Sequence, residues 1–194
     1  MLRYERDLWN RGIALVAGVD EAGRGPLAGP VVAAAVVFHP HSFLSEVNDS
    51  KQLSPMRREL LFDAIMAEAA GVGIGVVGHE LIDQVNILNA TFLAMHKAIQ
   101  RLSVVPEYLL VDGNRFVSAG IPFVTIVGGD ASSHCIAAAS IIAKVARDRM
   151  MLEYDRQFPG YGFAKHKGYP TYEHREAIKR LGYCDIHRRT FKVR

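Results

Sequence analysis

The chain has 194 residues, 49% of them hydrophobic, and a formal net charge of +3 at pH 7. This length and composition suit one buried core in one domain, or one domain with a small appendage, and no apolar run is long enough to span a membrane. The N-terminus lacks the apolar segment of a signal peptide, and Cys135 and Cys184 fit neither a disulfide framework nor a zinc pattern, so we expect a cytoplasmic protein with reduced thiols.

After a polar lead-in with possible helical character at residues 1–12, two apolar runs at residues 13–19 and 31–38 flank a hinge rich in Gly and Pro. Apolar runs of this length between turn residues are typical of buried strands, so we expect two strands joined by a turn at residues 20–30. The turn begins with Asp20 and Glu21, whose charges are costly to bury unless a cation compensates them. A partner Lys or Arg, or a metal ion, would supply that compensation.

The middle of the chain alternates predicted helices and strands. Ser54-Pro55 predicts a helix start, and apolar spacing predicts helices over residues 55–70 and 87–102, with a connection at residues 79–86. The remaining predicted elements are strands at 108–111 and 122–127, a helix that Ser132-Ser133 caps and that extends to about residue 157, and a helix near 172–181.

Residues 71–78 contain a G-x-G-x-x-G pattern at Gly73, Gly75 and Gly78. A dinucleotide-binding loop must follow a strand and open a helix, whereas this run follows a predicted helix and alternates its glycines with Val and Ile. We therefore expect a Gly-rich strand packed closely against a neighbour, and we disfavour the alternative of a nucleotide-binding protein.

Basic residues gather at the C-terminal end of the chain. Residues 165–194 contain nine Lys or Arg and three Asp or Glu, for a charge of +6, whereas residues 1–164 have a charge of −3. Such asymmetry indicates a polyanionic partner, and the alternative is a solvated basic face. The composition changes at Phe158-Pro159-Gly160, so we divide the chain into a main domain at residues 1–157 and a basic, mostly helical region at residues 158–194 that would bind the polyanion.

Three predicted strands end beside an aspartate: Asp20, Asp112 and, shortly after the third strand, Asp130. If these strands are parallel neighbours, their carboxyl ends meet at one edge of the sheet. Glu21 joins them if the chain turns at once, because successive strand residues point to opposite faces. All-oxygen ligands suit Mg²⁺ or Mn²⁺, and two such ions can act together on a phosphodiester. The alternative is that these acids only cap helices and form turns.

Gly23-Arg24-Gly25 is the second candidate feature. Glycines let the backbone approach a ligand closely, and Arg pairs with phosphate through two parallel hydrogen bonds. The alternative is a tight hairpin that carries a solvated Arg.

The hinge segment Val19-Asp20-Glu21-Ala22-Gly23-Arg24-Gly25-Pro26 resembles a motif of the bacterial ribonuclease HII family. Five further segments resemble that family in the same order, from the first strand to residue 191: Asn48 to Ser54, Val111 to Asn114, Gly129-Asp130 with the Ala-rich helix that follows, Tyr161 to Thr171, and His187 to Phe191.

The resemblance implies an α/β fold, in which a ribonuclease H-like mixed β-sheet is flanked by helices and followed by a small helical C-terminal region. It implies a metal-dependent endonuclease that cleaves the RNA strand of RNA–DNA hybrids and incises 5′ of single ribonucleotides in duplex DNA, leaving 5′-phosphate and 3′-hydroxyl ends. Asp20, Glu21, Asp112 and Asp130 match the catalytic carboxylates of the family, which hold two Mn²⁺ or Mg²⁺ ions, with Asp20 bridging both.

The resemblance also implies residues that bind the substrate. Gly23, Arg24 and Gly25 match the segment that reads the ribose 2′-OH at the RNA-to-DNA junction, the group that separates RNA from DNA at one nucleotide. Tyr169 matches the tyrosine that packs on the sugar and base pair beside the cut, and Lys51 would meet backbone phosphate. The alternatives are a core role for Tyr169 and an ordinary surface position for Lys51.

The chain departs from the family pattern in two places. Gly128 stands where many members have Lys, which would weaken phosphate affinity, and Ser133-His134-Cys135 is locally unusual. The rival hypotheses are another nuclease on the same scaffold and a non-catalytic RNA–DNA hybrid-binding protein. Pure binding gains nothing from carboxylates that face phosphates, so we favour the enzyme, acting as a monomer on hybrids and ribonucleotide-containing duplexes without a membrane.

Overall fold

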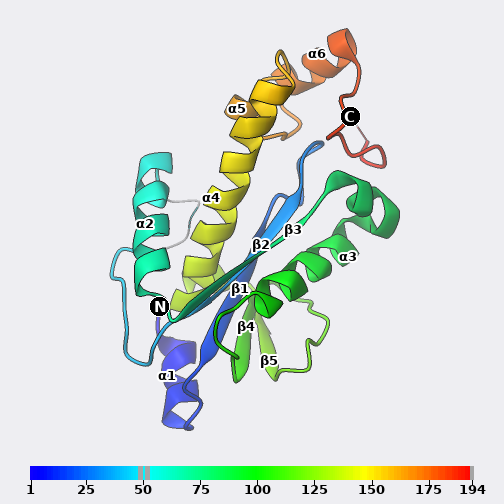
Figure 1. The fold of residues 1–194 in the computed structure, drawn as a ribbon. Coiled ribbons are helices and arrows are strands. Elements are labelled where there is room, and N and C mark those ends of the chain that lie inside the picture. The colour runs from blue at the N-terminus through cyan, green and yellow to red at the C-terminus, as the bar shows by residue number, and fades with distance from the viewer. Residues whose placement is uncertain (48–49, 51–52, 193–194) are drawn as a thin grey trace.

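The computed structural model describes the chain except for residues 48–49, 51–52 and 193–194. A mixed five-stranded sheet with strand order β3-β2-β1-β4-β5 forms its centre (Figure 1). The strands are β1 (Val16–Ala22), β2 (Val31–Val37), β3 (Gly71–Val77), β4 (Tyr108–Asp112) and β5 (Phe123–Ile126). β2 pairs antiparallel with both β1 and β3, whereas β1, β4 and β5 are parallel neighbours. The parallel arrangement that the aspartate hypothesis required is therefore present.

Helices cover both faces of the sheet. They are α1 (Arg3–Asn10), α2 (Pro55–Glu68), α3 (His79–Gln100), α4 (His134–Gln157), α5 (Phe163–His166) and α6 (Tyr172–Leu181), together with a short 3₁₀ helix at Gly129–Ala131. Alternate residues of β2 pack in one core with α3, and the residues between them pack in a second core with α2 and α4. Burial on both faces explains why β2 is apolar without alternation.

The first strand extends further than its apolar run predicts. β1 continues through Asp20 and Glu21 to Ala22, because both acids keep an antiparallel register with Ala34 and Ala33 of β2. The predicted boundary, with the turn starting at Asp20, was wrong. The two acids consequently extend from opposite faces of one strand.

The predicted connection at residues 79–86 is also wrong, because α3 already begins at His79. The helix breaks at Asn86, whose φ is 67°, and the Asn86 side chain then accepts hydrogen bonds from the amides of Leu88 at 3.0 Å and Asn89 at 3.1 Å. Asn86 thus starts a second helical segment, where the apolar periodicity of residues 87–102 becomes visible.

The Gly-rich run forms β3, as predicted. A Cβ atom on Gly73 would lie 2.0 Å from the carbonyl oxygen of Ala98, and one on Gly75 would lie 2.0 Å from that of Ala94. The glycines therefore allow α3 to lie directly on the strand, which accounts for them without a nucleotide.

The C-terminal segment packs against the turn between β1 and β2. Backbone hydrogen bonds join Leu27 to Gly168 at 2.8 Å, Gly29 to Ile186 at 2.9 Å and Arg188 to Leu27 at 2.8 Å. The division at residue 157 stays a prediction. Within the described residues, no helix is both long and apolar enough to cross a membrane.

Candidate active site

The turn between β1 and β2, residues 23–30, is held by two buried arginines. Arg188 donates to the carbonyls of Gly23 at 2.6 Å, Arg24 at 2.9 Å and Gly29 at 3.0 Å. Arg147 donates to the carbonyls of Pro30 at 2.9 Å and Ala28 at 3.2 Å. The turn therefore has a defined shape although it lies outside the sheet.

Burial of these guanidinium groups is costly and indicates how tightly the turn is enclosed. Burial, followed by repulsion from Arg147, lowers the pKa of Arg188 to about 9. Both arginines lie in segments that resemble the family, but the sequence did not predict that they hold the turn. Arg147 carried a weak signal, since it lies two helical turns after Ser140 on α4, on the side of the helix that faces the site.

Asp20 is almost fully enclosed, with a relative exposure of 5%, close to the 4% of Asp130. Burial first, and then the charges of Glu21 and Asp112, raise its pKa well above the usual value. One Asp20 oxygen accepts a hydrogen bond from the Glu21 amide at 2.7 Å. A buried carboxyl next to two others is the environment that a cation would stabilise.

Glu21 has a cationic partner in the chain. The Arg24 guanidinium lies 3.2 Å from its carboxylate. Burial raises the pKa of Glu21, and Arg24 opposes that shift. The sequence analysis considered an arginine or lysine and a metal ion as the cation that offsets the buried acids. An arginine offsets the charge of Glu21, whereas the surroundings of Asp20 suit a metal ion.

Asp112 and Asp130 lie at the ends of neighbouring parallel strands. Asp112 is the last residue of β4 and accepts a hydrogen bond from the Gly129 amide at 2.7 Å. Asp130 is buried in the 3₁₀ helix that follows β5. The fold thus brings Asp20, Glu21 and Asp112 together, and it places Asp130 one residue from the backbone group that holds Asp112.

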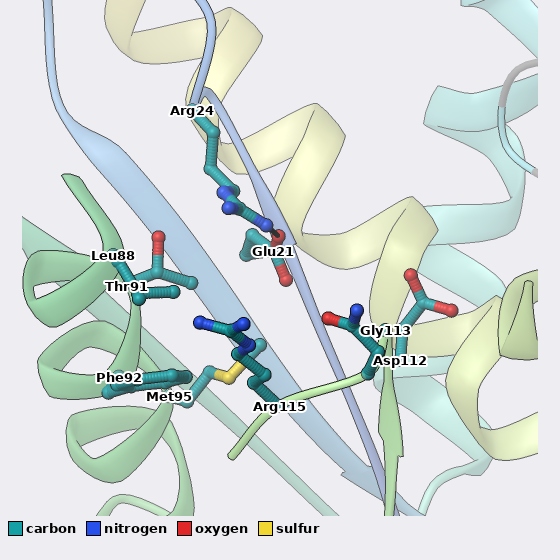
Figure 2. Close-up of a pocket in the computed structure, with 10 residues that line it drawn as sticks. Glu21, Arg24, Leu88, Thr91, Phe92, Met95, Asp112, Gly113 and Arg115 are labelled. Atoms are coloured by element: carbon teal, nitrogen blue, oxygen red, sulfur yellow. Dashed lines mark hydrogen bonds and ion pairs between the residues drawn. The ribbon is translucent and has the colours of Figure 1, made fainter. Parts of the chain in front are cut away.

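Two cavities open beside these carboxylates, and both are lined by Glu21, Arg24 and Asp112. The first, of about 300 Å³, we call the hinge cavity; its other lining residues are Asp20, Ala22, Gly23, Gly25, Ser50, Arg58, Ser140, Lys144 and Tyr169. The second, of about 280 Å³, we call the α3 cavity; its other lining residues are Leu88, Thr91, Phe92, Met95, Gly113, Asn114 and Arg115. Figure 2 shows Arg24 lying against Glu21 in the α3 cavity, with the α3 side chains on the facing wall.

The hinge cavity collects the predicted substrate-binding residues that the structure describes. Gly23, Arg24 and Gly25 line it together with Tyr169, which is 43% exposed. A Cβ atom on Gly25 would lie 3.5 Å from the Tyr169 ring. The structure therefore places these four residues together; Lys51 lies outside the described residues.

Two cations that sequence reasoning missed also line the hinge cavity. Lys144 pairs with Asp148 at 2.7 Å, and Arg58 donates to the carbonyl of Ser50 at 2.9 Å. Lys144 lies one helical turn after Ser140, so the spacing on α4 would have placed them on one face. Arg58 had no comparable signal, because its position depends on how α2 packs against α4.

The donor chemistry of the candidate site fits a hard divalent cation. The candidate ligands are carboxylate oxygens, which Mg²⁺ and Mn²⁺ prefer over softer donors. In the described part of the chain, no three His, Cys, Asp or Glu residues form a ready-made coordination set. Mg²⁺ keeps several waters and uses one or two carboxylates together with substrate phosphate, so such a partial set is what a substrate-assisted site requires.

Comparison with known proteins gives consistent matches over almost the whole chain. The ribonuclease HII family model matches residues 17–194. The ribonuclease HII of Endomicrobium trichonymphae is 56% identical over 190 residues, covering 97% of this chain and 90% of the relative. That of Geotalea uraniireducens is 55% identical over 192 residues, covering 99% and 89%.

The fold matches as well. The crystal structure of ribonuclease H2 from Pyrococcus horikoshii superposes with a TM-score of 0.77 at 30% identity, covering 92% of this chain and 94% of the other. This likeness confirms the predicted ribonuclease H-like mixed sheet flanked by helices.

Proposed function

Because the chain belongs to the ribonuclease HII family of metal-dependent endonucleases that act on RNA–DNA hybrids, we propose that it also incises duplex DNA 5′ of single embedded ribonucleotides. We propose Asp20, Glu21, Asp112 and Asp130 as the catalytic carboxylates and the ligands of two Mn²⁺ or Mg²⁺ ions. The observation that carries the proposal is the convergence of Asp20, Glu21 and Asp112 on a cavity that Gly23–Gly25 and Tyr169 also line.

The turn offers hydrogen-bond donors to a ribose hydroxyl. Arg188 occupies the carbonyls of Gly23 and Arg24, whereas the amides of Arg24 and Gly25 donate to nothing within the described residues. Amide donors that are left open at a cavity wall are suited to the oxygen of a 2′-OH, and they read it without contacting a base edge. This supports discrimination at a single ribonucleotide.

The remaining residues of the hinge cavity position the strand. Tyr169 offers an exposed ring face for stacking, which tolerates any sequence. Arg58 and Lys144 supply positive charge beside the carboxylates, where a phosphate has to approach. Arg24 offsets the charge of Glu21. When bound, the divalent ions would supply Lewis acidity that activates a water and stabilises the leaving oxygen, giving 5′-phosphate and 3′-hydroxyl ends.

The decisive experiment maps the cut in three duplexes: one with a single ribonucleotide, an RNA–DNA hybrid and an all-DNA control, each with and without Mn²⁺. We expect incision 5′ of the ribonucleotide, no incision of all-DNA, and a loss of more than about a hundredfold in rate for Asp20→Asn or Asp112→Asn. Near-normal turnover of both variants would contradict the carboxylate assignment.

Folding controls accompany these variants. Asp20→Asn removes a buried charge that faces two like charges, so its Tm in metal-free buffer should equal or exceed that of the wild type. Mn²⁺ should raise the Tm of the wild type and not that of the variant. An unchanged Tm response of the variant to Mn²⁺ would contradict Asp20 as a metal ligand, and a wild type that bound hybrids but cut none of the three duplexes would favour the rival hypothesis of a binding protein without catalysis.

A further inference from the structure

Glu5 is an unusual residue for a surface helix. It belongs to α1, whose residues precede the segment that the family model matches, and yet its side chain is completely buried. Acidic side chains are almost never fully buried unless they are paired. The hydrogen-bond partners of Glu5 therefore indicate what it does.

The Glu5 carboxylate is bound to the start of α4. One oxygen accepts hydrogen bonds from the Ser133 hydroxyl at 2.6 Å and from the Cys135 amide at 3.0 Å. The second oxygen has no hydrogen-bond partner among the described residues. A negative charge is favourable at this helix end, because the dipole of the 24-residue α4 is positive there. Within the segment Ser133-His134-Cys135, Ser133 thus has a buried side-chain partner.

The backbone of the N-terminal segment also contacts the start of α4. The His134 amide donates to the carbonyl of Met1 at 2.9 Å, and Leu2 forms an isolated antiparallel bridge with Ser133. The backbone of Ser133 therefore pairs with Leu2, and its side chain is hydrogen-bonded to Glu5.

Ser133 in turn closes the 3₁₀ helix that carries Asp130. The amides of Ser132 and Ser133 both donate to the carbonyl of Gly129, at 2.9 Å and 2.8 Å. The Gly129 amide donates to Asp112 at 2.7 Å. A path of hydrogen bonds thus leads from Glu5 through Ser133 and Gly129 to the carboxylate of Asp112, and the next residue after Gly129 is Asp130.

We propose that Glu5 is a positioning residue that fixes Asp130 and Asp112, so that α1 forms part of the frame of the metal site. This inference rests on the proposed function, because it takes Asp112 and Asp130 as ligands. It goes further in assigning a role to an N-terminal helix that touches neither the substrate cavity nor the carboxylates. Groups that orient metal ligands typically change metal affinity by about 10–100-fold when mutated.

The test measures Mn²⁺ binding directly, by calorimetry without nucleic acid, in wild type and in Glu5→Gln. We expect the Mn²⁺ dissociation constant to rise about tenfold while the KM for an RNA–DNA hybrid at saturating Mn²⁺ stays within about twofold. Asp7→Asn is the matched control, since Asp7 is an exposed acid on the same helix. Ile65→Val, in the buried contact between α2 and α4, controls for lost stability.

Each outcome bears on the role of Glu5 or on the ligand set. Wild-type Mn²⁺ affinity in Glu5→Gln, with or without a lower Tm, would overturn the inference and leave Glu5 as a fold-stabilising residue. If Glu5→Gln does not fold, Ser133→Ala removes the other partner of the 2.6 Å hydrogen bond and carries the same expectation. Asp130→Asn separates the hypotheses: unchanged affinity in that variant contradicts the proposed ligand set itself, whereas weaker binding in Asp130→Asn alone contradicts only the role of Glu5.

Discussion

Asp20 and Glu21 are adjacent in the sequence but differ in surroundings. Asp20 is enclosed, and its pKa is raised by burial and by two neighbouring acids, whereas Glu21 has Arg24 beside it. The sequence predicted that both sit near a strand end, because an apolar run stops there. It did not predict their different neighbours, since these depend on which face of β1 each side chain occupies, and the strand continues past both residues.

The two glycines of Gly23-Arg24-Gly25 should respond differently to substitution. Gly23 has a φ of +96°, and a Cβ atom there would lie 2.1 Å from Arg147 Nε, so Gly23→Ala should destabilise the fold by about 2–4 kcal/mol. Among the described residues, a Cβ atom on Gly25 would meet the Tyr169 ring alone, at an ordinary contact distance of 3.5 Å. Gly25→Ala should therefore keep the wild-type stability. Urea unfolding of both variants checks this difference.

The functional half of this prediction concerns Gly25 alone. Its added methyl group would occupy the space where we place the ribose, so incision at a single ribonucleotide should fall at least about tenfold relative to a long RNA–DNA hybrid. The measurement is the ratio of kcat/KM for the two substrates. An unchanged ratio in a fully folded Gly25→Ala variant would argue against recognition of the 2′-OH by this turn.

At the scale of elements, the sequence predicted what local patterns encode and missed what tertiary contacts decide. The cap at Ser133, the strand at β3 and the helix at α6 were confirmed, because each depends on neighbouring residues. The start of α3 was missed, because the break at Asn86 interrupts its periodicity. The supports of the turn, Arg147 and Arg188, were also missed, since they lie more than 100 residues further along the chain.

Buried histidines connect α6 to the site. The hydrogen-bond pattern assigns neutral tautomers: His174 Nδ1 donates to the Tyr169 carbonyl at 2.9 Å, and His187 Nε2 donates to His174 Nε2 at 3.1 Å. His187 Nδ1 then accepts from the Cys184 amide at 3.0 Å. Protonation of His174 would add a proton at Nε2, where it would face the N–H of His187 Nε2, so two donors would meet and this hydrogen bond would be lost. This chain of hydrogen bonds ends at the backbone carbonyl of Tyr169, the predicted stacking residue. Protonation of the two histidines therefore bears on the candidate site.

This arrangement predicts an acid-sensitive fold. Burial is the main cause that lowers the pKa of His187 to about 4 and also lowers that of His174, whereas an unfolded histidine titrates near 6.5. The unfolded chain therefore takes up protons first as pH falls. The contribution of His187 to the free energy of unfolding is complete above about pH 6.5. It decreases by on the order of 2–3 kcal/mol as the pH falls towards 4.

Urea unfolding at pH 7.5 and pH 5 measures this loss. His187→Gln removes the titrating group, so the difference in unfolding free energy between the two pH values should shrink in the variant. His39→Gln is the control, because His39 is exposed, and it should keep the wild-type difference. An equal pH dependence in all three proteins would show that the acid sensitivity arises elsewhere, for example at His134, whose pKa burial also lowers to about 4.

At the scale of the whole molecule, the charge asymmetry of the sequence predicted a polyanion-binding end but not how it is attached. Arg188 is buried and binds three carbonyls of the turn, while its neighbour Arg189 is exposed. A count of charges cannot separate these two roles. Deleting residues 165–194 would therefore remove a support of the candidate site along with the surface charge, and it would not isolate electrostatics.

Neutralising exposed cations isolates the electrostatic contribution. Lys165 of α5 and Lys179 and Arg180 of α6 are exposed, and among the described residues their partners are Glu173, Glu176 and Gly160 and not the turn. Each cation that meets a phosphate should contribute about 0.9 to the slope of log Kd against log salt. The triple Gln variant should therefore weaken hybrid binding and reduce that slope by up to about 2.7, with Tm unchanged.

The matched control lies at the opposite end of the molecule, where Figure 1 shows α1. Arg3 and Arg6 of α1 are exposed, and so is Arg11, the residue that follows the helix. Replacing these three by Gln changes the net charge equally, so it separates local phosphate contacts from the overall field of the protein. If both triple variants lower the slope by the same amount, the basic end acts only through net charge. If only the α6 variant lowers it, residues 158–194 contact the nucleic acid directly, as the predicted substrate-binding region requires.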